Sequence, residues 1–221
     1  MAISSVGSAT AQATTIAIPS HQAGDLIFIF AGRPNSTAAT VPSGWVQAGS
    51  VGANAVSVAA GWKIAKSSSE TSGTWTNAVV LHCVVYRGDK LLAISTTAGG
   101  ATGTGTSVSY ATGTNILVYR AGGEDNWYIG IGMQSNSANS LETAPSGMTN
   151  RSVESSSGAW KSVLHDTNAS QLSNWVTAAT TVTTAAASCT RVYQLIEFDG
   201  PSFGGGGGIF FRPGMSGGMS E

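Results

Sequence analysis

Asp25-Leu26-Ile27-Phe28-Ile29-Phe30 is an acidic residue followed by an apolar run of strand length, and a similar stretch begins about 100 residues later. The later stretch reads Asp125-Asn126-Trp127-Tyr128-Ile129-Gly130-Ile131. Short runs rich in β-branched and aromatic residues favour β-strands. A return at this distance, with no shorter period, indicates two similar halves rather than a solenoid.

Other motifs recur in the same order along the two halves. Pro42-Ser43-Gly44-Trp45 returns as Pro145-Ser146-Gly147-Met148, and Trp62-Lys63 returns as Trp160-Lys161. The remaining pairs are Trp75 with Trp175 and Val85-Tyr86 with Val192-Tyr193. We therefore expect each pair to occupy equivalent strands of a duplicated fold.

Alternation with a period of two residues dominates the chain, as residues 14–18 and 55–64 illustrate. Residues 79–86 form a nearly continuous apolar run, which is typical of a central strand covered on both faces. No segment keeps a 3.6-residue period beyond one turn. The sequence predicts an all-β, antiparallel, jelly-roll-like β-sandwich over residues 1–199, with halves at about 1–95 and 96–199.

Two tandem immunoglobulin-like domains of about 100 residues each are the alternative architecture. Asp89-Lys90-Leu91-Leu92-Ala93-Ile94, at the junction of the halves, continues as a strand pattern. Because no polar, proline-rich linker separates the halves, we favour one domain over two tandem domains.

Charged residues make up only 10% of the chain, against roughly 25% in ordinary soluble domains. Ser and Thr supply about a quarter of all residues, so hydroxyl groups provide most of the polarity. The net charge of −1 and the absence of basic runs argue against nucleic-acid and anionic-membrane partners. The first residues lack the basic and apolar regions of a signal peptide, which predicts synthesis in the cytoplasm.

The candidate catalytic residues form no recognisable constellation. His82 lies in an apolar run and is interpreted as a hydrogen-bonded core histidine. His165-Asp166 precedes a turn-like Thr167-Asn168, and the alternative to a turn is a metal site or a catalytic dyad. His21 has no partner nearby in the sequence, and no clustered Cys/His spacing indicates zinc. The carboxylates, among them Glu142, Glu154 and Asp166 of the second half, are scattered, and no G-x-S-x-G elbow occurs. We therefore expect no enzyme activity and no cofactor.

Cys83 and Cys189 fall on near-equivalent final strands of the two halves. A disulfide and two buried thiols are both compatible with this spacing, and cytoplasmic synthesis favours the thiols.

The six tryptophans are interpreted chiefly as structural core, because most recur at paired repeat positions. They are Trp45, Trp62, Trp75, Trp127, Trp160 and Trp175. The alternative is a sugar-binding role, since exposed indoles can stack on the apolar faces of sugars.

Residues 200–221 form a Gly-rich C-terminal arm that includes five consecutive glycines, Gly204 to Gly208. Glycines have no side chain to bury and a high ordering entropy, so this stretch cannot form a core of its own. We expect it to dock on a neighbouring subunit, the alternative being a tail folded back on its own sandwich. The predicted assembly contacts are Phe203, Ile209, Phe210, Phe211, Arg212 and Met215.

Five turn and core signatures resemble a β-sandwich module of tailed-bacteriophage virion proteins. They are Gly24-Asp25-Leu26-Ile27, Val41-Pro42-Ser43-Gly44-Trp45, Gly61-Trp62-Lys63-Ile64-Ala65, Gly73-Thr74-Trp75-Thr76 and Val85-Tyr86-Arg87-Gly88. The resemblance is best over residues 1–90 and looser over 100–199, where Met148 replaces a tryptophan and residues 111–124 look like an insertion.

The resemblance implies a non-enzymatic structural protein on the virion surface, tail-associated as a fibre, spike or tip and involved in host-surface attachment. A head decoration protein is one alternative, and a carbohydrate-binding or carbohydrate-active protein is a rival from another class. The expected partners are further copies of the chain, with a trimer as our prediction, other virion proteins and host polysaccharide. The family pattern contributes no catalytic residue.

Overall fold

The computed structural model describes residues 3–53, 55–95, 100–110, 126–136, 138, 140–171 and 178–198, which contain β-strands and no helix. The strands are β1 (Ser4–Ala11), β2 (Leu26–Arg33), β3 (Val46–Ala53), β4 (Val56–Ile64), β5 (Val80–Arg87), β6 (Leu91–Ser95), β7 (Gly100–Gly103), β8 (Ser107–Tyr110), β9 (Asn126–Gln134), β10 (Thr149–Ser156), β11 (Trp160–Asp166), β12 (Ala178–Thr181) and β13 (Ser188–Phe198). The predicted all-β class is confirmed.

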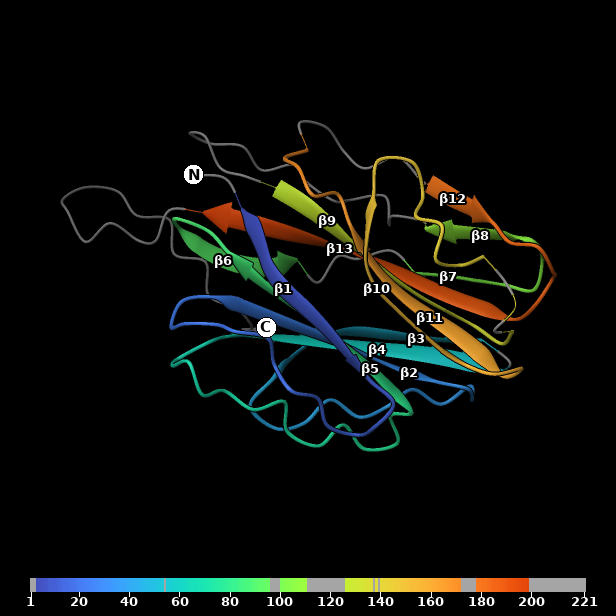
Figure 1. Cartoon of the computed structure of the whole chain (residues 1–221), viewed down its shortest axis with the longest axis horizontal. Coiled ribbons are helices and arrows are strands. Elements are labelled where there is room, and N and C mark those ends of the chain that lie inside the picture. Colours follow the sequence, from blue (N-terminus) through green and yellow to red (C-terminus); the bar gives the residue numbers. More distant parts are fainter. Residues whose placement is uncertain are drawn as a thin grey trace, which may run out of the picture.

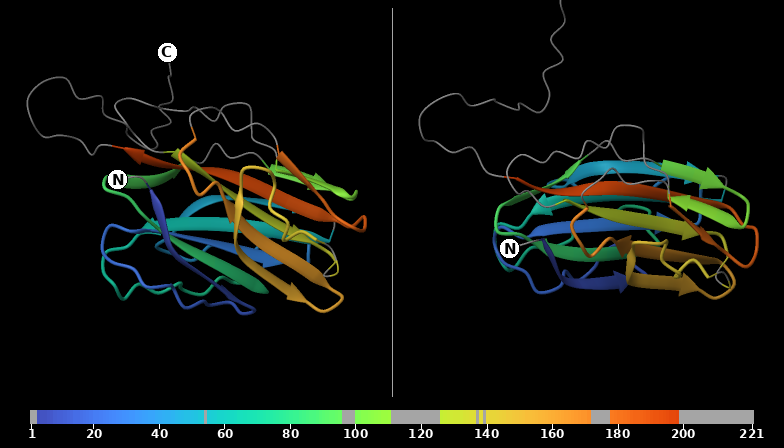
Figure 2. Two further views of the ribbon diagram at one scale, coloured as in Figure 1. Left: turned by 45° about the horizontal axis from the view of Figure 1, so that its top comes forward. Right: turned by 90° about the horizontal axis from the view of Figure 1, so that it is seen from above.

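Two antiparallel sheets lie face to face as the layers of a sandwich (Figure 1, Figure 2). The first sheet has the order β1-β5-β2-β4-β3, and the second has the order β10-β11-β9-β13-β6, with β7 also paired to β13. A two-stranded ladder of β8 and β12 is separate from both. Apart from β6, which lies in the predicted first half but pairs in the second sheet, the two large sheets draw on different halves of the chain. In a jelly roll, by contrast, the strands cross between the sheets.

The two sheets share one strand order, since β1-β5-β2-β4-β3 in the first corresponds to β6-β13-β9-β11-β10 in the second. The Pro42 and Pro145 turns are also alike: Gly44 and Gly147 have φ values of 84° and 82°. Each turn leads into an edge strand, β3 or β10, with a register shift a few residues later. This likeness agrees with the repeated motifs, while the duplication itself stays a prediction.

Trp62 and Trp160 lie on corresponding strands of the two sheets, but at different positions along those strands. Trp62 lies near the end of β4 and pairs with Phe28, whereas Trp160 is the first residue of β11 and pairs with Ser156. Both tryptophans still pack against the same core cluster, Trp160 as a buried member and Trp62 as a half-buried neighbour.

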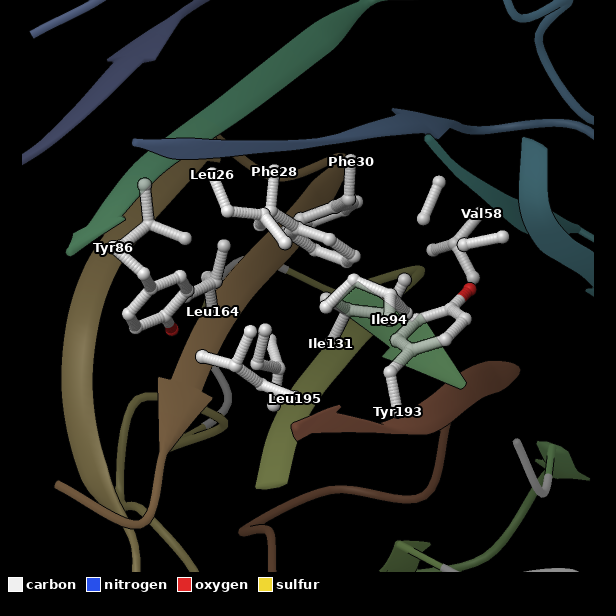
Figure 3. Close-up of a cluster of buried hydrophobic side chains, with 14 of the residues drawn as sticks. Leu26, Phe28, Phe30, Val58, Tyr86, Ile94, Ile131, Leu164, Tyr193 and Leu195 are labelled. Carbon is white, nitrogen blue, oxygen red and sulfur yellow. The ribbon is translucent and has the colours of Figure 1, made fainter. Parts of the chain in front are cut away.

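The main core lies between the sheets and takes side chains from both halves of the chain. Leu26, Phe28 and Phe30 of β2 point toward Ile131 and Tyr193 of the opposite sheet (Figure 3). All five side chains are fully buried, and the Phe28 and Tyr193 rings meet edge to face at 5.3 Å. Each buried Leu, Ile or Phe contributes about 1.5–3 kcal/mol from area alone, so this shared core is the main stabilising element.

A second cluster covers the outer face of the first sheet, where Ile27 and Ile29 pack with the fully buried Trp75. The outer face of the second sheet is covered in part by Tyr110 of β8, which lies across glycines of β9. A Cβ atom at Gly132 would lie 2.8 Å from the Tyr110 hydroxyl. Glycine is therefore required there for close packing.

One strand expected from the sequence is absent, because residues 14–18 form no strand. Ile16 of this segment instead packs on the outer face of the first sheet, and the Trp75 amide donates to the Thr14 carbonyl at 2.8 Å. The segment therefore covers the sheet rather than extending it.

Several predictions fall outside the described residues. They concern Trp175, the expected insertion at 111–124 and the assembly contacts Phe203, Ile209, Phe210, Phe211, Arg212 and Met215.

Candidate functional site

His82 of β5 links the two sheets from inside the sandwich. Its Nδ1 lies 2.7 Å from the Ser152 hydroxyl and its Nε2 lies 2.8 Å from the Ser162 hydroxyl, both on the opposite sheet. The ring stacks on Phe30 at 4.5 Å. Burial, together with the nearby His165, lowers the His82 pKa to about 3, so the imidazole is neutral. The predicted core histidine is confirmed.

Asp166 of β11 forms a second polar connection between the sheets. Its fully buried carboxylate accepts hydrogen bonds from the Tyr86 hydroxyl at 2.9 Å and from Arg151 Nε at 2.7 Å. His165 is its neighbour in the strand, so the two side chains point to opposite faces and form no dyad. The His165 ring meets Tyr110 edge to face, and burial lowers its pKa to about 4.

A third connection joins the edge strands β1 and β10. The Glu154 carboxylate accepts hydrogen bonds from the Thr10 hydroxyl and from Gln12 Nε2, each at 3.0 Å. These hydrogen bonds outweigh burial and lower the Glu154 pKa. His82, Asp166 and Glu154 therefore each connect the two sheets.

The described residues contain no group of three or more His, Cys, Asp or Glu side chains that could hold a metal ion. Glu142, another scattered carboxylate, pairs separately with Lys161 at 2.6 Å. Cys83 and Cys189 are both buried and free, as the thiol interpretation expected. Burial raises the pKa of the Cys189 thiol to about 12, which disfavours its reactive thiolate.

A surface pocket of about 530 Å³ lies where the Pro42 turn, the end of β4 and the following loop meet. Trp45, Trp62, Lys63, Glu70 and Thr71 are among its lining residues. The Pro-Ser-Gly turn places Trp45 at this point through a backbone hydrogen bond of 3.3 Å between the Trp45 amide and the Pro42 carbonyl. The volume lies within the range of small-molecule sites.

An ion pair fixes the polar side of the pocket. Lys63 Nζ lies 2.7 Å from Glu70 Oε2, donates to the Thr71 carbonyl at 2.9 Å, and sits 4.7 Å from the centre of a Trp45 ring. The Lys66 amide donates to Glu70 Oε1 at 2.9 Å. Hydrogen bonds from Lys63 and then from the Lys66 amide lower the pKa of Glu70.

His21 holds the loop that carries Glu70. Its Nε2 accepts a hydrogen bond from the Glu70 amide at 3.1 Å, so the ring proton is on Nδ1, which donates to the Pro19 carbonyl at 2.7 Å. Sequence reasoning found no partner for His21, because the contact joins segments 49 residues apart. The only sequence signal for this site was the set of tryptophans.

The structure divides the tryptophans into two groups. Trp75, Trp127 and Trp160 are buried, whereas Trp45 and Trp62 are half-buried. The half-buried pair packs against the core clusters and also lines the pocket. Packing therefore accounts for only part of the surroundings of Trp45 and Trp62.

The fold and the site together define an antiparallel β-sandwich with polar connections between its sheets and an aromatic pocket on its surface. Searches against protein-family models, curated proteins and solved structures find no match to the chain. Within the described residues, no helix is long and apolar enough to cross a membrane.

Proposed function

We propose that the chain is a non-enzymatic structural protein of a tailed-bacteriophage particle, located in the tail as a fibre, spike or tip component. The observation that carries this proposal is the use of His82, Asp166 and Glu154, the groups best suited to chemistry, as connections between the sheets. The turn and core signatures of the first 90 residues support the particle assignment by resemblance.

Three edge strands of the sandwich are bulged, which protects against aggregation when many copies of the protein are held close together in a particle. Register shifts interrupt the pairing of β1 after Ser5, of β3 after Gln47 and of β10 after Asn150. Such bulges twist an edge and discourage open-ended pairing with other sheets. The protein would then assemble through a dedicated contact rather than through these edges.

In this proposal residues 200–221 provide that contact, and a closed trimer is the expected assembly. Each Phe buried against a neighbour would contribute about 1.5–3 kcal/mol, which offsets part of the ordering cost of the glycines. Deleting residues 200–221 should leave the sandwich folded and reduce the oligomer seen by light scattering. A truncated chain that assembles as well as the full chain contradicts the docking arm.

The particle assignment is tested by mass spectrometry and quantitative electrophoresis of purified particles. Tens of copies per particle support a tail location, while hundreds indicate a head decoration protein. Absence of the chain from particles that infect normally would overturn the proposal.

A further inference from the structure

The outer edge of β6 differs from the other three edges of the two large sheets (Figure 1). Within the described residues, β6 pairs only with β13, and the register runs from Leu91–Phe198 to Ser95–Gln194 without a shift. The strands at the other edges, β1, β3 and β10, are each bulged. An even edge without a bulge leaves backbone N–H and C=O groups in position to pair with a further strand.

Side chains also tie the three bulged edges to the opposite sheet. The Glu154 carboxylate of β10 joins the β1 edge at Thr10. On β3, the Ser50 carbonyl accepts a hydrogen bond from Arg191 Nη1 at 2.6 Å, and the Gly49 carbonyl accepts one from the Tyr193 hydroxyl at 3.4 Å. The β6 edge instead carries an apolar side chain that is 49% exposed, that of Leu91. It is therefore the edge of the large sheets best suited to accept another strand.

The last described strand, β13, ends beside this edge, because its final residue Phe198 pairs with Leu91. Ten residues, 199–208, six of them glycine, then precede Ile209-Phe210-Phe211-Arg212. β-branched and aromatic residues favour strands, and Pro213 ends this stretch because proline has no N–H to donate to a ladder. Residues 209–212 therefore match the short β6 in length and in apolar character.

The direction of pairing favours a segment from another copy of the chain. All described strand pairs of the large sheets are antiparallel, and β13 is antiparallel to β6. A segment of the same chain that ran antiparallel to β6 would be parallel to β13. Such a connection needs a crossover of about a dozen residues or more, and only ten precede Ile209. A second copy meets no such limit, since its segment can approach β6 in either direction.

We propose that the β6 edge of one copy binds residues 209–212 of another copy as an added antiparallel strand. Backbone hydrogen bonds hold the segment, as in other complexes formed by strand addition. Neighbouring residues of a strand point to opposite faces, so one of the two phenylalanines lies on the face of Leu91 and packs against it. The inference rests on the docking arm of the proposed function and names the surface that receives it. Each copy donates one segment and accepts one, which allows the head-to-tail contact to close into a ring.

The test mixes two full-length variants that carry one added cysteine each and lets disulfides form under mild oxidation. In antiparallel pairing Arg212 lies near Leu91 and Ile209 near the other end of β6. Leu91→Cys chains should therefore cross-link to Arg212→Cys chains, and less to Ile209→Cys chains, in non-reducing electrophoresis. Cys83 and Cys189 are buried and free, so they do not compete. Val79→Cys is the matched control, since Val79 is 37% exposed but lies outside β6, and it should give no mixed product.

A second measurement uses light scattering of Leu91→Lys. Association should weaken about tenfold or more, because the apolar contact is lost to a charge that must keep its water. Val79→Lys should associate as the parent does, and thermal unfolding establishes that both variants are folded. Absence of the Leu91–Arg212 cross-link, a preference for Ile209→Cys, or normal association of Leu91→Lys would overturn the β6 site. If deletion of residues 200–221 still reduces the oligomer, the docking arm stands and binds elsewhere, so the two proposals fail separately.

Discussion

At the scale of single residues, buried polar groups decide how stability responds to pH. His82 is fully buried with two serine partners, and its pKa falls from an ordinary 6.5 to about 3. Between pH 3 and pH 6.5, His82 is therefore protonated in the unfolded chain and neutral in the folded chain. The stabilisation is complete above pH 6.5 and is lost as the pH falls toward 3.

His82→Gln should reduce this acid sensitivity. The parent should lose up to about 1.4 kcal/mol of unfolding free energy per pH unit from this one group, as measured by urea unfolding from pH 7 to pH 4. Ser152→Ala is the control, since it removes one partner and keeps the imidazole, so it lowers stability while the slope persists. An unchanged slope in His82→Gln means that other groups cause the acid sensitivity.

Asp166→Ala should be among the most destabilising charge deletions, because it leaves Arg151 and the Tyr86 hydroxyl without their shared carboxylate. Breaking a buried pair costs about 3–5 kcal/mol. Glu142→Ala breaks a pair whose carboxylate side chain is 44% exposed, so it should cost less than Asp166→Ala, although the Lys161 side chain of that pair is only 11% exposed. Similar losses for both variants in chemical denaturation contradict the role of Asp166 between the sheets.

At the scale of elements, the sequence predicts central strands well and edge strands poorly. The alternating pattern at 55–64 and the apolar run at 79–86 correspond closely to β4 and β5, whose inner positions are buried on both faces. Among the edge strands, β1, β3 and β10 were not predicted, nor was the short β7, whereas β6 follows the strand pattern at 89–94. The small and hydroxyl-bearing residues of strands such as β1 and β10 are partly exposed, so they carry no strong alternation that a sequence could display.

The pocket illustrates the same limit at the level of a site. Tryptophans can be flagged in a sequence, but the contacts of Glu70 with Lys63 and His21 depend on how a loop folds over a sheet. Loop positions of this kind have no periodic pattern from which they could be predicted.

Gly132→Ala tests the close approach of β8 to β9. The new Cβ would lie 2.8 Å from the Tyr110 hydroxyl and 3.3 Å from Thr190 Cγ2, so overpacking should cost about 1–3 kcal/mol. Adding Tyr110→Phe should restore most of this loss in thermal unfolding, because it removes the hydroxyl that collides. Gly103→Ala, whose Cβ would meet its nearest neighbour at 3.5 Å, should be nearly neutral. If Tyr110→Phe does not restore stability to Gly132→Ala, the contact with the Tyr110 hydroxyl is not the cause of the loss.

At the scale of the whole molecule, the shared core couples the two sheets. Side chains of both halves form one buried cluster, so neither sheet can keep its inner face dry alone. Equilibrium unfolding should therefore be a single transition that tryptophan fluorescence and circular dichroism report at the same denaturant concentration. Two separated transitions would indicate halves that fold independently.

The described strands of the large sheets change layer once along the chain, between β5 and β6. On the ribosome, the first sheet therefore emerges with Leu26, Phe28 and Phe30 uncovered, and their partners on β9 to β13 follow about 100 residues later. At 5–20 residues per second this delay lasts roughly 5–20 s. During that interval the inner face of the first sheet stays uncovered, and a chain that ends before β13 lacks a central strand of the second sheet, so we expect such a truncated product to aggregate rather than fold.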